Sequence, residues 1–239
     1  MSHIDLGGDA PLRLLSFTGP APHRLSDACL DELDGALDEL ERAPPSVLLL
    51  LGTAGDFLAG ADLAELLAIM EKRAPSHGMA KARRGLFTLR RLQQLASFTI
   101  CYIDGHCLGG GLDLALHCDA RWVSPKAALG HPGIQRHFFT GWGGTDLLAR
   151  LPEGAPALLS GEIVKGDTAV ARGWAQALIA DEAAAIEKAR EAALALAAIS
   201  APERKLRKEL WLRAQNLSPR RHKQLSQRAM QLLAAAALP

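Results

Sequence analysis

The fold is decided by Ile103-Asp104-Gly105-His106-Cys107-Leu108-Gly109-Gly110-Gly111-Leu112-Asp113, in which three consecutive glycines separate an apolar strand from a helix. Because glycine has no side chain, a ligand oxygen can come close to the backbone N–H groups there. The helix that begins at these glycines points further N–H groups, and the positive end of its dipole, at the same spot. The stretch predicts an oxyanion hole with Asp113 as an acid–base group at its edge. The alternative is a tight turn whose acid stabilises the helix dipole.

A second loop of small residues lies upstream, at Phe57-Leu58-Ala59-Gly60-Ala61-Asp62-Leu63. It follows the apolar run Val47-Leu48-Leu49-Leu50-Leu51, which is typical of a strand buried on both faces. Residues 64–71 after the loop are apolar at helical spacing. Each of these two strand–loop–helix junctions can therefore donate one backbone N–H to the same carbonyl oxygen.

Together the two loops resemble the signature loops of the crotonase (enoyl-CoA hydratase/isomerase) superfamily, and the resemblance runs over residues 10–180. It implies an α/β fold, a crotonase-like spiral of ββα units with a C-terminal helical region. We expect residues 1–180 to form the spiral core with the thioester site. Residues 181–239 are expected to form helices that close the site and assemble a homotrimer or a homohexamer. Apolar residues suited to such an interface, or to packing within the chain, are Leu225, Met230, Leu232 and Leu233.

Composition limits the other classes of function. The chain has 239 residues and a formal net charge of +1, which fits one sizeable domain and argues against bulk nucleic-acid binding. The sequence has no run of about 18 apolar residues and no secretory leader pattern, so we expect neither a membrane span nor export. Four cysteines without a C-x-x-C pair indicate reduced core thiols in the cytoplasm rather than a metal site. They are Cys29, Cys101, Cys107 and Cys118.

The remaining sequence alternates between strand and helix patterns. Ser26 is expected to cap a helix, and the chain from Asp181 onward is expected to be nearly all helix. Asp167 and Gly173 are expected to cap and to end a short helix. Further strands are expected at residues 12–17, 99–103, 120–123 and 127–129.

The resemblance also implies the chemistry. Enzymes of this family bind an acyl-coenzyme A thioester, polarise its carbonyl with two backbone N–H groups and stabilise an enolate. The two donors map to Ala59 and Gly110. Coenzyme A then enters as part of the substrate, without a permanently bound cofactor or a metal. In a plainer interpretation, Asp62 only caps the helix that follows it. The residues expected to touch the substrate are Ala59, Gly60, Ala61, Asp62, Leu63, Gly109, Gly110 and Gly133.

The sequence departs from the family at its second acid. Hydratases of this family add water with two glutamates. The first falls at Asp113, and the second falls at Gly133, where the family's Pro-Glu becomes Pro132-Gly133. The run Gly141-Trp142-Gly143-Gly144-Thr145 fixes this alignment, since it matches the family's glycine-rich turn without a gap. Removing one of two cooperating acid–base groups commonly lowers the rate by about 10²–10⁴-fold.

Histidines near the vacant position can replace the missing acid, because histidine titrates near neutrality. His131 and His137 flank Gly133, and His106 precedes the three glycines. Each of them can instead be a surface histidine or a hydrogen-bonded core histidine. The catalytic candidates are Asp113, Ala59, Gly110, His131 and His137.

Three functions remain open at this point. The first is a hydratase or isomerase of coenzyme A thioesters, in which Asp113 moves a proton. The second is a decarboxylase or carbon–carbon hydrolase on the same scaffold, where Arg136 can pair with a substrate carboxylate. The third is a non-catalytic homologue that binds acyl-CoA. A serine protease of this fold is excluded, because no serine lies between Ser97 and Ser124.

Basic side chains gather in the C-terminal part of the chain. They can form a solvated helix face or meet the phosphates of coenzyme A. Nucleic-acid binding is disfavoured, because Trp211 is nearly alone there as a stacking partner. These side chains are Arg204, Lys205, Arg207, Lys208, Arg213, Arg220, Arg221, Lys223 and Arg228.

Overall fold

The computed structural model describes residues 1–71, 75–136 and 141–214 of the chain. The prediction for His137 lies outside these described residues, and so do the predictions for the apolar and basic residues from Leu225 and Arg220 onward. No helix within the described ranges combines the length and the apolar character that crossing a membrane requires.

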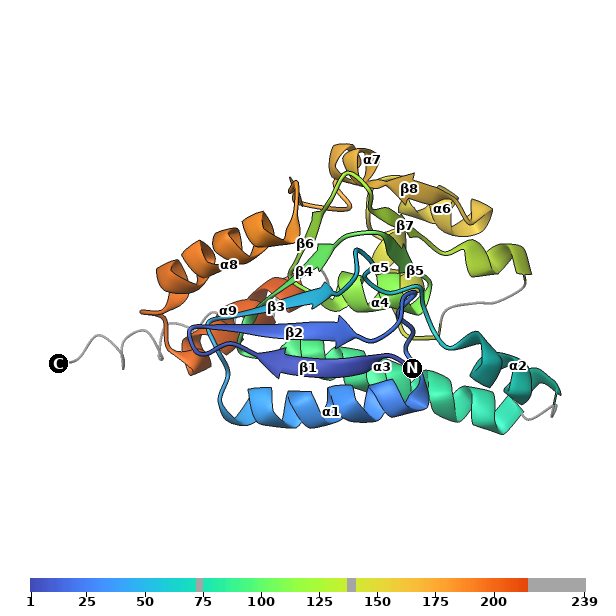
Figure 1. Cartoon of the computed structure of the whole chain (residues 1–239), viewed down its shortest axis with the longest axis horizontal. Helices are drawn as coiled ribbons and strands as arrows, with labels where there is room; N and C mark the ends of the chain where they lie inside the picture. Colours follow the sequence, from blue (N-terminus) through green and yellow to red (C-terminus); the bar gives the residue numbers. More distant parts are fainter. Residues whose placement is uncertain (72–74, 137–140, 215–239) are drawn as a thin grey trace.

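A six-stranded sheet forms the centre of the molecule, in the order β1-β2-β3-β4-β6-β9 (Figure 1). β1 runs antiparallel to β2, and the other neighbours pair in parallel. The strand β1 was not predicted, because a half-exposed edge strand with only two aliphatic residues gives a weak apolar pattern. The strands are β1 (His3–Gly7), β2 (Leu12–Thr18), β3 (Val47–Gly52), β4 (Phe98–Ile103), β6 (Ala120–Val123) and β9 (Ala177–Leu178).

A smaller sheet of three strands has the order β5-β7-β8. It contains β5 (His106–Leu108), β7 (Ala128–Gly130) and β8 (Ile163–Lys165). β5 and β7 are parallel, with Leu108 opposite Gly130. Because parallel strands end at the same edge, the chain segments that follow β5 and β7 emerge side by side.

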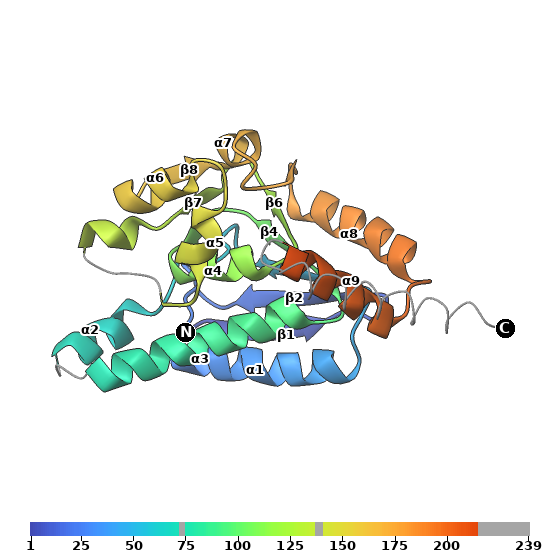
Figure 2. The same ribbon diagram turned by 180° about the vertical axis from the view of Figure 1, so that it is seen from behind.

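Helices cover both faces of the central sheet. Alternate residues of β3 pack into two separate cores, Leu48 and Leu50 into one and Leu49 into the other. The prediction of a strand buried on both faces is therefore confirmed. The first core also contains α1 (Asp27–Arg42), α3 (Pro75–Gln94) and α4 (Gly110–His117), whereas α8 (Glu182–Leu196) contributes a stripe of alanines to the second (Figure 2). The other helices are α2 (Leu63–Glu71), the 3₁₀ helix η1 (Pro132–Arg136), α5 (Gly144–Ala149), α6 (Gly154–Ser160), α7 (Gly166–Ala171) and α9 (Ala201–Ala214).

Helix ends follow local side-chain chemistry. The Ser26 hydroxyl accepts the N–H of Cys29 at 3.2 Å and caps α1 as predicted. The prediction of Asp167 as the cap of α7 is wrong, since the helix begins at Gly166 and Lys165, two residues before Asp167, occupies the cap position. Asp167 lies in the first turn instead, where a carboxylate also favours the helix dipole. Gly173 follows the end of α7 at a φ of +74°, which confirms it as the terminator.

The basic residues of α9 do not form a uniformly solvated face. Arg204 donates to the carbonyl oxygens of Pro44 and Ala96 at 3.2 and 3.0 Å. Lys208 donates to the carbonyl of Ser97 at 2.7 Å and pairs with the buried Asp119 at 2.6 Å. These carbonyls precede β3 and β4, so α9 ties together the amino ends of two central strands. Backbone carbonyls that a helix covers need hydrogen-bond donors from the protein, and Arg204 and Lys208 supply them here.

Candidate active site

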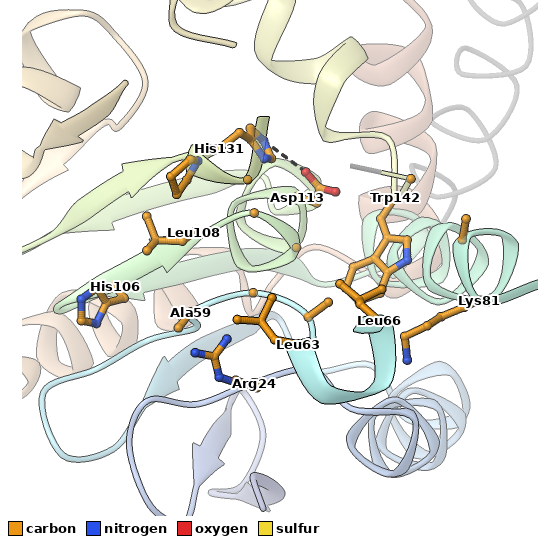
Figure 3. A pocket seen from close by; sticks show the side chains of 18 of the residues that line it. Arg24, Ala59, Leu63, Leu66, Lys81, His106, Leu108, Asp113, His131 and Trp142 are labelled. Atoms are coloured by element: carbon orange, nitrogen blue, oxygen red, sulfur yellow. Dashed lines mark ion pairs between the residues drawn. The ribbon is translucent and has the colours of Figure 1, made fainter. Parts of the chain in front are cut away.

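A cavity of about 520 Å³ opens where the two signature loops meet (Figure 3). Arg24 and His106 lie toward one end of it, and Leu66, Trp142 and Lys81 lie toward the other. The structure thus brings together residues from loops far apart in the sequence. The predicted site residues that line it are Ala59, Gly60, Ala61, Leu63, Gly109, Gly110, Asp113, His131 and Gly133.

Two parallel strands of the small sheet bring Asp113 and His131 together. β5 leads into the glycines and α4, and β7 leads into His131. The Gly109 N–H donates to the Gly130 carbonyl at 2.9 Å and links the ends of the two strands. Asp113, in the first turn of α4, therefore faces the residue that follows β7.

The second loop lies against β5 through backbone hydrogen bonds. The Leu58 N–H donates to the His106 carbonyl at 2.8 Å, and the Leu108 N–H donates to the Leu58 carbonyl at 2.9 Å. Gly60 has a φ of +104°, and a Cβ there would lie 2.9 Å from the Leu108 oxygen. Only glycine meets both demands, so the sequence places the turn of this loop at residue 60.

The prediction that Ala59 supplies an oxyanion-hole donor does not fit the structure. The Ala59 N–H donates to the His23 carbonyl at 2.8 Å and is already used. By contrast, the Ala61 N–H has no hydrogen-bond partner among the residues that the structure describes. A Cβ built on Gly110 would lie 3.4 Å from the Ala61 nitrogen, and one on Gly60 would lie 3.6 Å from the Gly110 nitrogen. The two backbone donors that approach each other are therefore those of Ala61 and Gly110.

Asp113 and His131 form a buried pair in the cavity wall. Their side chains are 1% and 4% exposed, and His131 Nε2 lies 3.3 Å from Asp113 Oδ1. Burial lowers the pKa of His131 to about 4, so the imidazole is neutral at physiological pH. A carboxyl and a neutral imidazole in contact can hold and exchange a proton next to a bound substrate.

Gly144, at the start of α5, lies directly against this pair. A Cβ built there would come within 1.6 Å of Asp113 Oδ1, so any side chain at residue 144 would displace the carboxylate. This contact gives a physical reason for the glycine that follows Gly143 in the glycine-rich turn.

Asp62 and Gly133 were predicted to touch the substrate, but neither offers a polar side chain to the cavity. Asp62 Oδ1 accepts the N–H groups of Ala64 and Glu65 at 2.9 and 3.1 Å and thus caps α2, and the residue does not line the cavity. Gly133 lies in η1 and borders the cavity without a side chain. No carboxyl group can therefore act from position 133.

Trp142, Lys81 and Arg24 also line the cavity and were not among the predicted site residues. Trp142 is 5% exposed. Lys81 is held by Asp27 at 2.6 Å and by Glu65, so its charge is balanced. Arg24 has no ion pair within the described ranges and offers an uncompensated cation at the rim. In the sequence, Arg24 is recognisable only as a basic residue two positions before the helix cap Ser26.

The chain matches known proteins over most of its length. The family model "Enoyl-CoA hydratase/isomerase" matches residues 12–236. The chain is 33% identical over 194 residues to a "Probable enoyl-CoA hydratase" of Bacillus subtilis, covering 80% of this chain and 74% of that protein. It is 29% identical over 154 residues to a "Short-chain-enoyl-CoA hydratase" of Clostridium acetobutylicum, covering 63% and 58% of the two chains. A crystal structure of an enoyl-CoA hydratase from Bacillus anthracis superposes with a TM-score of 0.85 at 26% identity, covering 96% of this chain and 90% of that chain.

Proposed function

The chain belongs to the enoyl-CoA hydratase/isomerase family of the crotonase superfamily and is an enzyme of that type, and we propose that it moves a proton through a thioester enolate. The observation that carries this proposal is the approach of two backbone N–H groups, those of Ala61 and Gly110, beside the buried carboxyl of Asp113. Neither N–H group has a hydrogen-bond partner in the part of the chain that the structure describes. The substrate is an acyl-coenzyme A thioester, and coenzyme A enters as part of it.

Ala61 and Gly110 hold the thioester oxygen in this proposal. Negative charge develops on that oxygen when the neighbouring carbon loses a proton, and both N–H groups stabilise it. One such donor is typically worth about 3–4 kcal/mol in the transition state. Ala61 replaces Ala59 in this role, because the N–H of Ala59 is donated to His23.

Asp113 and His131 supply the proton chemistry. The Asp113 carboxylate takes a proton from the carbon next to the thioester carbonyl, and the enolate forms against Ala61 and Gly110. The same proton then returns to a different carbon of the acyl group, which shifts the double bond. His131 orients the Asp113 carboxyl and holds a proton at Nε2 when the carboxyl is ionised. One acid–base unit is enough for this isomerisation, which fits the missing acid at Gly133.

Arg24 orients the substrate. Its guanidinium is the cation at the rim that no described side chain neutralises, and guanidinium groups suit phosphate oxygens. The phosphates of coenzyme A are therefore placed at the end near Arg24 and His106. The acyl group then extends toward Leu66 and Trp142 (Figure 3).

The assembly and the compartment are part of the proposal. The exposed apolar side chains of Met79 and Phe87 on α3, 57% and 66% exposed, support burial in a homotrimer or homohexamer. Four free, buried cysteines support a reducing compartment such as the cytoplasm. Light scattering on the purified protein measures the number of subunits.

The test of the proposed function compares the wild type with Asp113→Asn on enoyl-CoA thioesters that have the double bond at either position. We expect the wild type to interconvert the two isomers and Asp113→Asn to lose at least about 10²-fold in kcat. The matched control is Asp167→Asn, which makes the same change on the surface of α7.

Four outcomes would count against this proposal. Full activity of Asp113→Asn would remove the acid–base assignment. Water addition without isomerisation would identify a hydratase that works without the second carboxylate. If the wild type turned over malonyl-type thioesters but no enoyl thioester, the decarboxylase alternative would take its place. Binding of thioesters without any turnover would identify a non-catalytic homologue.

A further inference from the structure

Trp142 is the one large side chain in the glycine-rich turn 141–144. Its neighbours have no room for a side chain: a Cβ at Gly141 would lie 2.7 Å from the Ala82 Cβ, and a Cβ at Gly144 would lie 1.6 Å from Asp113. The turn therefore passes close to α3 on one side and to Asp113 on the other. Between these contacts it places a single indole in the cavity wall.

Two glycines from other elements make space for this indole. A Cβ at Gly85 of α3 would lie 2.2 Å from Trp142 Nε1, and a Cβ at Gly110 of α4 would lie 2.6 Å from Trp142 Cζ3. Both distances are far shorter than a carbon contact allows. The ring thus lies directly on the backbone of α3 and of the first residue of α4. Trp142 is 5% exposed, as expected for a ring packed on both sides.

The position of the ring bears on the acyl group. Gly110 donates one of the two N–H groups that hold the thioester oxygen in the proposed function, and the far edge of the indole lies against the same residue. With coenzyme A at the Arg24 end, the acyl chain leaves the carbonyl toward Trp142 (Figure 3). A chain that extends beyond a few carbons meets the ring, which the backbone of Gly85 and of Gly110 supports from behind.

We propose that Trp142 closes the acyl end of the cavity and restricts the enzyme to thioesters with short acyl groups. This inference rests on the proposed function, because it takes the carbonyl position from Ala61 and Gly110. It adds a specificity-determining residue and a substrate class, short-chain acyl-CoA thioesters, to that function.

The test measures binding rather than turnover, so that it does not depend on the identity of the reaction. Dissociation constants for butanoyl-CoA and decanoyl-CoA are measured by calorimetry for the wild type, Trp142→Phe and Trp142→Ala. We expect the wild type to bind butanoyl-CoA at least about 10-fold more tightly than decanoyl-CoA. Trp142→Ala should lower this preference for the shorter thioester by about 10-fold or more. The preference of Trp142→Phe should lie between that of the wild type and that of Trp142→Ala.

Two controls keep the result interpretable. Trp211→Ala makes the same chemical change on α9, at a side chain that is 53% exposed, and should leave the ratio unchanged. Trp142→Phe keeps an aromatic ring between Gly85 and Gly110, so it reports on chain length even where Trp142→Ala does not fold.

The outcomes separate this inference from the proposed function. Equal affinity of the wild type for both thioesters, or an unchanged ratio in both Trp142 variants, overturns the role of Trp142 and leaves the enolate chemistry intact. If neither thioester binds the wild type, the proposed function fails and this inference fails with it.

Discussion

Two histidine–aspartate pairs lie in the same cavity region and differ in their surroundings. His131 and Asp113 form one in the cavity wall, where their side chains are 4% and 1% exposed. His106 and Asp56 form the other near the rim, where the histidine is 57% exposed and the aspartate 6%. The residue types are the same, and only one pair has both members buried.

Hydrogen bonding separates the roles of the two aspartates. Asp56 accepts the backbone N–H groups of His23 and His106 at 3.0 and 3.1 Å in addition to the His106 ring at 2.7 Å. It therefore holds two loops together. Asp113 and His131 instead line the cavity, and burial keeps the imidazole neutral. Burial and orientation, rather than residue type, distinguish a structural pair from a pair suited to acid–base chemistry.

The largest expected effect is a difference in kcat between variants of His131 and of His106. His131→Gln should lower kcat by about 10²–10⁴-fold on the substrate that the wild type turns over, because the buried partner of Asp113 is lost. His106→Gln makes the matched change at the rim and should affect kcat far less. Steady-state kinetics measure both. Equal losses in the two variants would show that burial does not distinguish the pairs.

The pH dependence of stability sharpens the same comparison. The native pKa of His131 is lowered from 6.5 to about 4, so between these values the unfolded chain binds a proton that the native protein does not. The contribution of His131 to the free energy of unfolding is complete above about pH 6.5. It is lost as the pH falls to about 4, by roughly 3 kcal/mol. Urea unfolding across this range should show a weaker pH dependence for His131→Gln than for the wild type. Identical slopes would contradict the lowered pKa.

A substitution in the pair of His106 and Asp56 should lower the stability of the protein more than its activity. Asp56→Asn keeps the shape of the side chain but weakens its bonds to the N–H groups of His23 and His106. We expect a loss of about 1–3 kcal/mol in the free energy of unfolding and a comparatively small change in kcat. Chemical denaturation and kinetics on the same sample measure both quantities. A large fall in kcat at unchanged stability would assign Asp56 to the chemistry instead.

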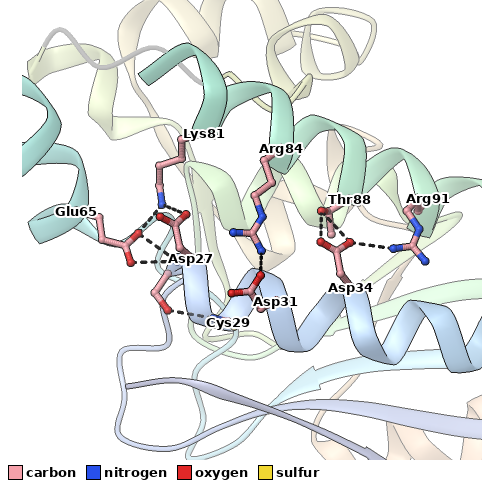
Figure 4. A network of polar contacts seen from close by, with 10 residues as sticks. Asp27, Cys29, Asp31, Asp34, Glu65, Lys81, Arg84, Thr88 and Arg91 are labelled. Atoms are coloured by element: carbon pink, nitrogen blue, oxygen red, sulfur yellow. Dashed lines mark hydrogen bonds and ion pairs between the residues drawn. The ribbon is translucent and has the colours of Figure 1, made fainter. Parts of the chain in front are cut away.

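The smallest expected effects concern the ion pairs between α3 and the helices beside it (Figure 4). The Lys81 side chain is 6% exposed and pairs with Asp27 and Glu65, whereas Arg84 is 32% exposed and pairs with the largely exposed Asp31. Lys81→Met should cost about 1–2 kcal/mol of unfolding free energy, because it leaves a partly buried carboxylate without its cation. Arg84→Met should cost less than about 1 kcal/mol. Equal melting temperatures for the two variants would contradict this ranking.

The sequence predicted the elements that depend on local patterns. A continuous apolar run identified β3, small residues identified both loops, and Ser26 identified the start of α1. It also placed Asp113 and His131 near one site. A local pattern does not reveal the hydrogen-bond partner of a backbone N–H group when that partner lies far away in the sequence. The bond from Ala59 to His23, which moves the donor role to Ala61, joins residues far apart in the chain.

Two further positions show the same limit. The turn 141–144 was recognised by its glycines, but the direction of the Trp142 ring depends on space left by Gly85 in α3. Arg204 was expected either on a solvated helix face or at the phosphates of coenzyme A. Its hydrogen bonds to Pro44 and Ala96 become visible only when α9 is placed against the sheet.

The attachment of α9 has a consequence for the order in which the molecule is completed during synthesis. β3 and β4 end at residues 52 and 103, yet the side chains that bond the carbonyls in front of them belong to Arg204 and Lys208. A growing chain therefore carries these loop carbonyls without their final donors until α9 has left the ribosome. By contrast, the backbone groups that bond the two cavity loops to each other all lie within the first 130 residues, so that part of the molecule needs nothing from α9.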